Sequence, residues 1–295
     1  MLAPLKLYKQ SRTICLALIF VALLFGVAQA NPADSIATVR QQLDQRVPGG
    51  VAVIALGQFQ DQPNVLFQNT PVLTIADDNQ QWWAVVGLAL DTPVGAHFLE
   101  VVRESTSESP RRVTFNVANK TYRSQHIRLK NKAMVSPNPS TLARIKEELD
   151  IQINGYQTFT ATTPSNLLFD APVSGQLSSP FGLRRYFNGE PRNPHSGLDF
   201  AAPSGTPVKA PADGRVLLIG NFYFNGQTIF LDHGQGLITM FCHLSEIAHL
   251  PGDRVKRGQV VGKVGSTGRS TGPHLHWNVS LNNARVNPAL FLKAR

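Results

Sequence analysis

The sequence predicts a mainly β protein: a small antiparallel β domain, a short connecting helix and a larger antiparallel β-sheet domain. Short apolar runs separated by turn residues recur in both halves of the chain, a spacing typical of antiparallel strands. One stretch combines a helix cap with apolar residues at helical spacing. The 295 residues, 42% of them hydrophobic, are enough for two separate cores.

The first 30 residues have the pattern of a secretory signal peptide. Lys6, Lys9 and Arg12 precede an apolar run at 14–27, and residues 28–30 (Ala-Gln-Ala) provide a cleavage site. We therefore expect residues 1–30 to be removed on export, which leaves no stable membrane anchor on the mature chain. An uncleaved N-terminal anchor is the alternative interpretation.

Residues 31–47 are interpreted as an N-terminal spacer and residues 48–135 as a β-rich N-terminal domain. Its expected strands are short apolar runs between turn-rich segments: 51–56, 65–67, 81–90, 97–102, 113–117 and 122–127. His97 and His126 are isolated in this region, and we interpret them as packed or solvated side chains.

Residues 136–166 are predicted to contain a helix and a linker. Asn138 can cap the helix, with Pro139 in its first turn. Leu142, Ile145 and Leu149 lie along one side, so we expect the helix to pack between the two domains.

Residues 167–295 form the second predicted domain, in which two motifs carry metal-binding residue types. His195 and Asp199 form an H-x-x-x-D motif, placed in a loop leading into a strand because Gly197 and nearby prolines disfavour a helix. His274 and His276 form an H-x-H motif. The alternate residues from 275 to 281 are apolar, so both imidazoles point to the opposite face of a strand.

These residue types suit zinc chemistry. Two His and one Asp can supply the three protein ligands of an open zinc site, where the metal lowers the pKa of water. Together with His243, the two motifs contain more groups than three ligands require. Two histidines therefore remain for proton transfer or oxyanion stabilisation.

The surroundings of these motifs resemble the M23 (LytM/lysostaphin-type) zinc metallopeptidases, which cut peptide bonds in bacterial peptidoglycan. The similar stretches are 178–185, 195–216, 230–237, 243–245 and 265–277. The resemblance implies a LytM-type antiparallel β-sheet for residues 167–295. The region before it resembles the β-rich N-terminal domain of some Gram-negative M23 peptidases, which implies a periplasmic location.

By this resemblance, His195, Asp199 and His276 bind one Zn²⁺ per chain, and His243 and His274 are catalytic. His274 is expected to be the general base that deprotonates the attacking water. His243 is expected to stabilise the oxyanion or pass the proton to the leaving amine, although the two roles could be exchanged. His233 is interpreted as a turn residue or one that supports the ligands from behind.

Cysteine content and charge limit the remaining classes of function. Removal of the signal peptide leaves Cys242 as the one cysteine, which we interpret as a small buried residue rather than a catalytic thiol. The formal net charge of +9 falls to +6 with the loss of three basic residues, which suits an anionic cell wall. No arginine-rich run with interleaved aromatics indicates nucleic-acid binding.

The expected function is therefore a zinc-dependent peptidoglycan endopeptidase that hydrolyses peptide stems or cross-links. Its expected partners are peptidoglycan and a regulatory protein, and the chain is expected to be monomeric. Two alternatives are a non-catalytic LytM-like module that binds wall or activates an amidase, and a zinc peptidase acting on proteins. Non-catalytic modules typically lack some of the five site residues, all of which are present here. A D-alanyl–diaminopimelate bond is favoured over a glycyl bridge, and the N-terminal domain is expected either to restrain the enzyme or to target it.

Overall fold

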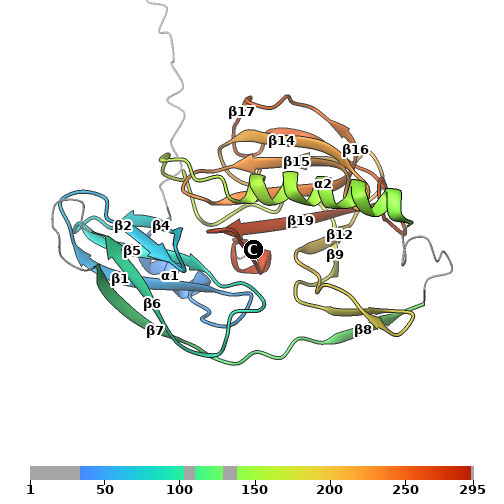
Figure 1. Ribbon diagram of the computed structural model, residues 1–295. Helices are drawn as coiled ribbons and strands as arrows, with labels where there is room; N and C mark the ends of the chain where they lie inside the picture. Colours follow the sequence, from blue (N-terminus) through green and yellow to red (C-terminus); the bar gives the residue numbers. More distant parts are fainter. Residues whose placement is uncertain (1–33, 103–109, 129–137, 294–295) are drawn as a thin grey trace, which may run out of the picture. The chain divides into compact units, whose positions relative to one another are not determined.

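Strands dominate the computed structural model, which describes residues 34–102, 110–128 and 138–293 (Figure 1). Two α-helices and four sheets lie within these ranges, which confirms the mainly β, antiparallel fold. The predicted signal peptide lies outside the described residues. Among the described residues, no helix is long and apolar enough to cross a membrane.

Two antiparallel sheets form the N-terminal β region, residues 51–117. One sheet has the order β1-β5-β4 and the other β3-β2-β6-β7. Buried side chains of both sheets, among them Ile54, Phe67, Val86 and Leu99, form one hydrophobic cluster. The strands are β1 (Val51–Gln58), β2 (Asn64–Phe67), β3 (Thr70–Pro71), β4 (Leu73–Ala76), β5 (Gln81–Gly87), β6 (Gly95–Val102) and β7 (Arg111–Val117).

Two elements differ from expectation in this half of the chain. The expected spacer contains helix α1 (Ile36–Leu43), which Ser35 caps and which buries Val39 and Leu43. Strand β8 (Ser124–Ile127) was expected to continue the N-terminal sheets, but it pairs in parallel with β10 (Arg184–Phe187). The apolar pattern of residues 122–127 indicated a strand, but it could not show which strand this one pairs with.

The largest sheet has ten strands and holds the histidine motifs. Its main path runs β17-β14-β15-β16-β19-β12-β9, with β13, β18 and β20 paired at its sides. The strands are β9 (Gln176–Ser179), β12 (Leu198–Ala201), β13 (Pro207–Lys209), β14 (Gly214–Phe222), β15 (Gly226–Asp232), β16 (Ile238–Ile247), β17 (Arg254–Val255), β18 (Val260–Val264), β19 (His274–Leu281) and β20 (Ala284–Val286). A short 3-10 helix, η2 (Pro288–Leu290), follows β20, and β11 (Glu190–Pro191) completes a hairpin with β10.

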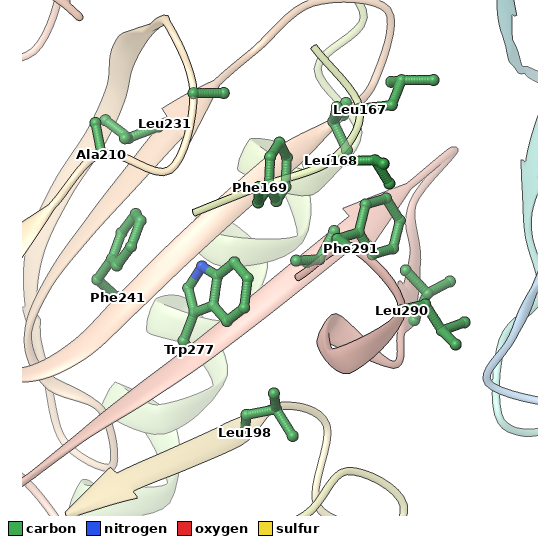
Figure 2. Close-up of a cluster of buried hydrophobic side chains, with 14 of the residues drawn as sticks. Leu167, Leu168, Phe169, Leu198, Ala210, Leu231, Phe241, Trp277, Leu290 and Phe291 are labelled. Atoms are coloured by element: carbon green, nitrogen blue, oxygen red, sulfur yellow. The ribbon is translucent and has the colours of Figure 1, made fainter. Parts of the chain in front are cut away.

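Strand β19 separates two faces, as its alternation predicts. Trp277, with no exposed surface, packs near Phe169, and Phe169 stacks on Phe291. Figure 2 shows these three rings together in the core. Leu275, Val279 and Leu281 belong to the same buried cluster. On the other face Asn278 and Ser280 are also buried, so this face is solvent-accessible mainly at its histidine end.

Helix α2 (Pro139–Tyr156) begins as predicted, because the Asn138 side chain accepts a hydrogen bond from the Thr141 backbone N–H. Its predicted packing side was wrong: Leu142 and Leu149 are 51% and 52% exposed. The helix instead buries Tyr156 at its C-terminal end, in a cluster with Phe230 and residues of β16. It therefore covers the large sheet.

Candidate metal centre

Asp199 and His276 meet because their strands are neighbours. In the antiparallel pair β12–β19 the two residues lie directly opposite each other, and opposite residues share a face of the sheet. Asp199 Oδ1 lies 2.7 Å from His276 Nδ1. His195, in the loop before β12, completes the group: its Nε2 is 2.9 Å from Asp199 Oδ1 and 3.0 Å from His276 Nδ1.

The loop at His195 approaches β19 closely, and two features permit this. A Cβ at Gly197 would lie 2.4 Å from the Trp277 carbonyl oxygen, so only glycine fits there. The His195 Nδ1 lies 2.8 Å from the Pro180 carbonyl oxygen. Because a carbonyl can only accept, Nδ1 carries the proton and Nε2 of the neutral ring has the free lone pair, directed at the group.

The donor set fits a zinc ion. His195 Nε2, Asp199 Oδ1 and His276 Nδ1 all lie within 4.8 Å of one another, and these are the atom types that zinc binds in open sites. Ligand atoms about 2.0–2.1 Å from a tetrahedral zinc stand about 3.3 Å apart. The observed separations are a few tenths of an ångström shorter, so a small opening of the group would accommodate the ion.

The carboxyl group of Asp199 is held ionised. Burial alone would raise its pKa, but the imidazole rings of His195 and His276, which both meet its Oδ1, hold the pKa well below its usual range. Its second oxygen, Oδ2, accepts a hydrogen bond from Arg185 Nη2 at 3.3 Å, and the same Nη2 donates to Ser179 Oγ at 3.0 Å. Asp199 is thus presented as an anion, the form that ligates a metal.

His243 reaches this face through an unusual backbone conformation. Its φ of 60° lies in the left-handed region, which residues other than glycine rarely adopt. In regular alternation its side chain would fall with Phe241 in the core, whereas its ring centroid lies 4.6 Å from that of His274. Such local strain concentrates at functional sites. Burial and the charges of His276 and His274 lower the pKa of His243 to about 3, so this ring is neutral.

His243 and His274 are oriented in the same way. His243 Nδ1 lies 2.8 Å from the Thr267 carbonyl oxygen, and His274 Nδ1 lies 2.8 Å from that of Gly272 and 3.1 Å from Ser270 Oγ. Each Nδ1 therefore carries a proton, which leaves Nε2 as the atom at which each ring can exchange a proton. Two acceptor histidines stand beside three metal donors.

The structure thus brings together all five predicted site residues and leaves the other histidines elsewhere. His233 bonds the Asp213 carbonyl oxygen and the Thr239 hydroxyl and packs near Phe169, away from the five residues. His97 stacks on Phe115, and His126 stacks on Tyr186. These interactions agree with structural roles for all three.

Cys242 is fully buried and free, and burial raises the pKa of its thiol to about 12. It therefore has the environment of a packing residue, as expected, and not that of a reactive thiol.

The sequence interpretation missed the residues that hold the site in place. Arg185, Ser179, Thr267 and Ser270 contact Asp199, His195, His243 and His274 respectively. All four lie in the stretches 178–185 and 265–277, whose resemblance to a known family was the available signal. An antiparallel sheet that presents two histidines and an aspartate for a metal, with two acceptor histidines beside them, has the composition of a metallohydrolase.

Comparison with known proteins identifies the family. Residues 193–288 match Peptidase family M23, and residues 44–120 match the Peptidase family M23 N-terminal domain. A crystal structure of an M23 peptidase from Pseudomonas aeruginosa is 47% identical, covers 86% of this chain and 97% of that chain, and superposes with a TM-score of 0.73. The chain belongs to peptidase family M23, a family of metallopeptidases.

Named relatives are similar over part of their length. The DD-carboxypeptidase/endopeptidase Mpg of Neisseria meningitidis is 44% identical over 116 residues, 39% of this chain and 27% of the relative. The peptidoglycan DD-endopeptidase ShyA of Vibrio cholerae is 42% identical over 113 residues, 38% of this chain and 26% of the relative. The chain spans about a quarter of the length of these relatives.

Proposed function

We propose that this chain is a zinc-dependent peptidoglycan endopeptidase that hydrolyses peptide stems or cross-links of the bacterial cell wall. The observation that carries the proposal is the convergence of His195, Asp199 and His276 on one point, with His243 and His274 beside it. A non-catalytic wall-binding module would have no need of the two additional histidines.

The substrate class is supported by the relatives. Mpg is named a DD-carboxypeptidase/endopeptidase and ShyA a peptidoglycan DD-endopeptidase. For this chain the corresponding substrate is the cross-link between D-alanine and the diamino acid of the neighbouring stem. A glycyl bridge is the less favoured bond.

In this proposal His195, Asp199 and His276 hold one zinc ion per chain. A zinc ion with three protein ligands supplies a Lewis acid and a water of lowered pKa at its open position. Arg185 supports Asp199 from behind through Oδ2. The Pro180 carbonyl fixes the tautomer of His195 so that Nε2 would be its ligating atom.

His243 and His274 would carry out the proton transfers of the reaction. Both rings present Nε2 for proton exchange, because each Nδ1 is bonded to a carbonyl. We assign His274 the role of general base toward water and His243 the stabilisation of the oxyanion or transfer to the leaving amine. A neutral His243 cannot donate from Nε2, so its part in stabilising an oxyanion begins only after it has received a proton.

Location and organisation complete the proposal. Cell-wall substrates lie outside the cytoplasm, which fits export by a signal peptide at residues 1–30 and action in the periplasm. We retain residues 48–135, 136–166 and 167–295 as the proposed N-terminal domain, connecting segment and peptidase domain.

Digestion of purified sacculi tests the function. The mature chain should release muropeptides whose masses, read by liquid chromatography and mass spectrometry, correspond to cleaved peptide cross-links. His274→Ala, matched for zinc content, serves as the control and should release far less. Intact sacculi after incubation with the zinc-loaded wild type would contradict the proposal.

A further inference from the structure

The turn between β14 and β15, here called the hairpin end (residues 223–227), supports His243 directly. The Asn225 carbonyl oxygen accepts a hydrogen bond from the His243 backbone N–H at 2.8 Å. The Gln227 backbone N–H donates to Thr267 Oγ1 at 2.9 Å, and the Thr267 carbonyl oxygen accepts from His243 Nδ1. The hairpin end therefore holds both the backbone of His243 and the loop that orients its ring.

This support matters because the backbone conformation of His243 is unfavourable by itself. The register of β15 and β16 shifts between Gln227 and Ile229, which places His243 in a bulge of β16. Its left-handed φ of 60° persists only where surrounding contacts determine it. The bulge turns the ring toward His274, with 4.6 Å between the ring centroids. The position of the His243 ring thus depends on the contacts of its backbone.

Helix α2 is bound to the hairpin end through Glu148. The Glu148 Oε2 accepts a hydrogen bond from the Tyr223 backbone N–H at 2.6 Å, and its Oε1 accepts one from Arg144 Nε at 2.6 Å. Arg144 Nη2 also donates to the Asn221 carbonyl oxygen, on the last turn of β14 before the hairpin end, at 3.2 Å. The Glu148 side chain is only 14% exposed. A hydrogen bond to a shielded carboxylate is stronger than one between neutral groups.

A second ion pair on the same helix shows how Glu148 differs from an ordinary surface residue. Lys146 and Asp150 also lie four residues apart, with 3.0 Å between Nζ and Oδ2, but their side chains are 79% and 57% exposed. Exposed pairs of this kind contribute little to stability. Glu148 uses its second oxygen to bind the backbone of an element 75 residues away in sequence. Its carboxylate therefore links the connecting helix to the site.

We propose that Glu148 is a positioning residue for His243. Its carboxylate holds the Tyr223 N–H and so fixes the hairpin end, whose Asn225 carbonyl keeps His243 in the bulge beside His274. The inference rests on the proposed peptidase function and extends it to the connecting segment. Helix α2 supports a catalytic histidine, although it lies outside the proposed peptidase domain.

Three variants of the zinc-loaded protein test the inference with a soluble cross-linked wall peptide as substrate. Glu148→Ala removes the acceptor, Glu148→Gln retains one oxygen for the Tyr223 N–H, and Asp150→Ala is the matched control that removes an ion pair from the same helix. Glu148→Ala should lower kcat about 10-fold with little change in KM, because the peptide still binds while the histidine is displaced. Glu148→Gln should stay within about threefold of the wild type, since it keeps the hydrogen bond. Asp150→Ala should match the wild type.

Amide hydrogen exchange gives a second readout that does not depend on hydrolysis. The backbone N–H groups of Tyr223 and His243 donate the two hydrogen bonds that carry the inference. Both should therefore exchange faster in Glu148→Ala than in Asp150→Ala, measured by nuclear magnetic resonance on the zinc-loaded proteins. If Glu148→Ala does not fold, Glu148→Asp replaces it, because aspartate keeps the charge on a side chain one methylene too short for this bond.

The outcomes separate this inference from the proposed function. Unchanged kcat in Glu148→Ala, an equal loss in Asp150→Ala, or a Glu148→Gln rate as low as that of Glu148→Ala would overturn the inference and leave the endopeptidase function standing. Exchange at the His243 amide no faster than in the wild type would also overturn it. A wild type that cleaves no wall peptide would contradict the proposed function, and faster exchange at His243 in Glu148→Ala would then still support the positioning role.

Discussion

At the scale of single residues, three of the site histidines share one arrangement. His195, His243 and His274 each have Nδ1 bonded to a backbone carbonyl, so Nε2 of each ring is the atom available for metal binding or proton exchange. What distinguishes them is position: the Nε2 of His195 converges with the donor atoms of Asp199 and His276, whereas the rings of His243 and His274 pair with each other. This difference separates the proposed ligands from the proposed catalysts.

The first prediction concerns the metal. The purified wild type should contain about one zinc ion per chain, and His195→Ala, Asp199→Ala and His276→Ala should each lose most of it, because two donors bind zinc much more weakly than three. Elemental analysis after dialysis measures this directly. Undiminished zinc in all three variants, or none in the wild type, would refute the ligand set.

The second prediction concerns the two acceptor histidines. His274→Ala and His243→Asn should keep zinc and fold but hydrolyse sacculi about 100-fold more slowly or worse, the usual scale for acid–base groups. Asparagine is chosen at position 243 because it tolerates the left-handed φ of 60° better than alanine does. A variant that retained the wild-type rate would show that its histidine has no part in the chemistry.

The third prediction concerns stability and pH at His233. Complete burial lowers the pKa of this ring from 6.5, its value in an unfolded chain. As pH falls below 6.5, His233 is therefore protonated in the unfolded state while it stays neutral in the folded state. Stability is lost in this window by up to about 1.4 kcal/mol per pH unit for this residue.

The corresponding variant removes that titration. His233→Gln should be less stable than the wild type at pH 7.5, because it disturbs the bonds to Asp213 and Thr239. Its free energy of unfolding should fall less steeply between pH 6.5 and 5, measured by urea denaturation. An identical pH slope in both proteins would mean that His233 does not carry this dependence.

At the scale of elements, the strand period is the feature that sequence could predict. A period of two places His274 and His276 on one face and Leu275 and Trp277 in the core, and the structure confirms this. The period could not predict that the His243 side chain lies on the same face as His274. Its position depends on the left-handed backbone conformation of His243 itself. The prediction that Leu142 and Leu149 of α2 are buried was wrong for a related reason. Apolar spacing shows which residues share one face of a helix, but it does not show whether another element packs against that face.

The same limit applies to Arg185 and Thr267, which are far apart in the chain and contact Asp199 and His243 respectively. Their common position beside the centre depends on how the loop after β9 and the loop before β19 fold back. No local pattern specifies that approach. The five site residues could be proposed because their motifs resemble a known family. The supporting residues lie in the same similar stretches, but no local pattern indicated their contacts.

The fourth prediction tests how one loop holds His243. Gly226 has φ 63°, and a Cβ there would lie 2.3 Å from Thr267 Oγ1 and 2.4 Å from the Thr267 carbonyl carbon. Gly226→Ala should therefore displace Thr267, whose carbonyl orients His243, and reduce hydrolysis at least about 10-fold. Gly258→Ala is the matched control, since it has φ 82° and open space around the added methyl.

Comparison of the two variants separates the effect of backbone strain at the substituted glycine from the effect of displacing Thr267. Both should lose a similar, small amount of stability from the left-handed backbone, about 1–2 kcal/mol, and Gly226→Ala should lose somewhat more through the clash. Only Gly226→Ala should lose activity at equal zinc content. Equal rates for the two variants would show that the contact with Thr267 does not matter for His243.

At the scale of the whole molecule, the two halves of the described chain share buried contacts. Val39, Leu73 and Val85 belong to the same hydrophobic cluster as Trp277 and Leu281. A truncated chain starting near Asn166 would expose this surface, so a change in its activity would combine instability with any loss of restraint. Point variants that loosen the contact give a cleaner test of what the N-terminal region does.

The fifth prediction uses the contact at Asn282. Its side chain accepts from the Gly87 N–H at 2.6 Å and donates to the Gly87 carbonyl at 3.1 Å, which ties β5 to the end of β19. Strand β8, from the same half of the chain, pairs with β10 beside Arg185. Loss of the Asn282–Gly87 hydrogen bonds should weaken the pairing of β8 with β10. A weaker β8–β10 pairing would give a substrate peptide easier access to the edge of the site. Asn282→Gly should therefore cut sacculi faster than the wild type.

Glycine removes these bonds without backbone strain, because Asn282 has φ 38°. Asn283→Gly is the matched control: Asn283 has φ 63°, lies in the same turn and accepts hydrogen bonds from Arg285 through its backbone and side-chain oxygens. Rates are compared at equal protein and zinc concentration, with thermal unfolding to confirm that both variants are folded. If the N-terminal region instead targets the enzyme to the wall, Asn282→Gly will cut sacculi more slowly than Asn283→Gly. That result would contradict the hypothesis that the N-terminal region restrains the enzyme.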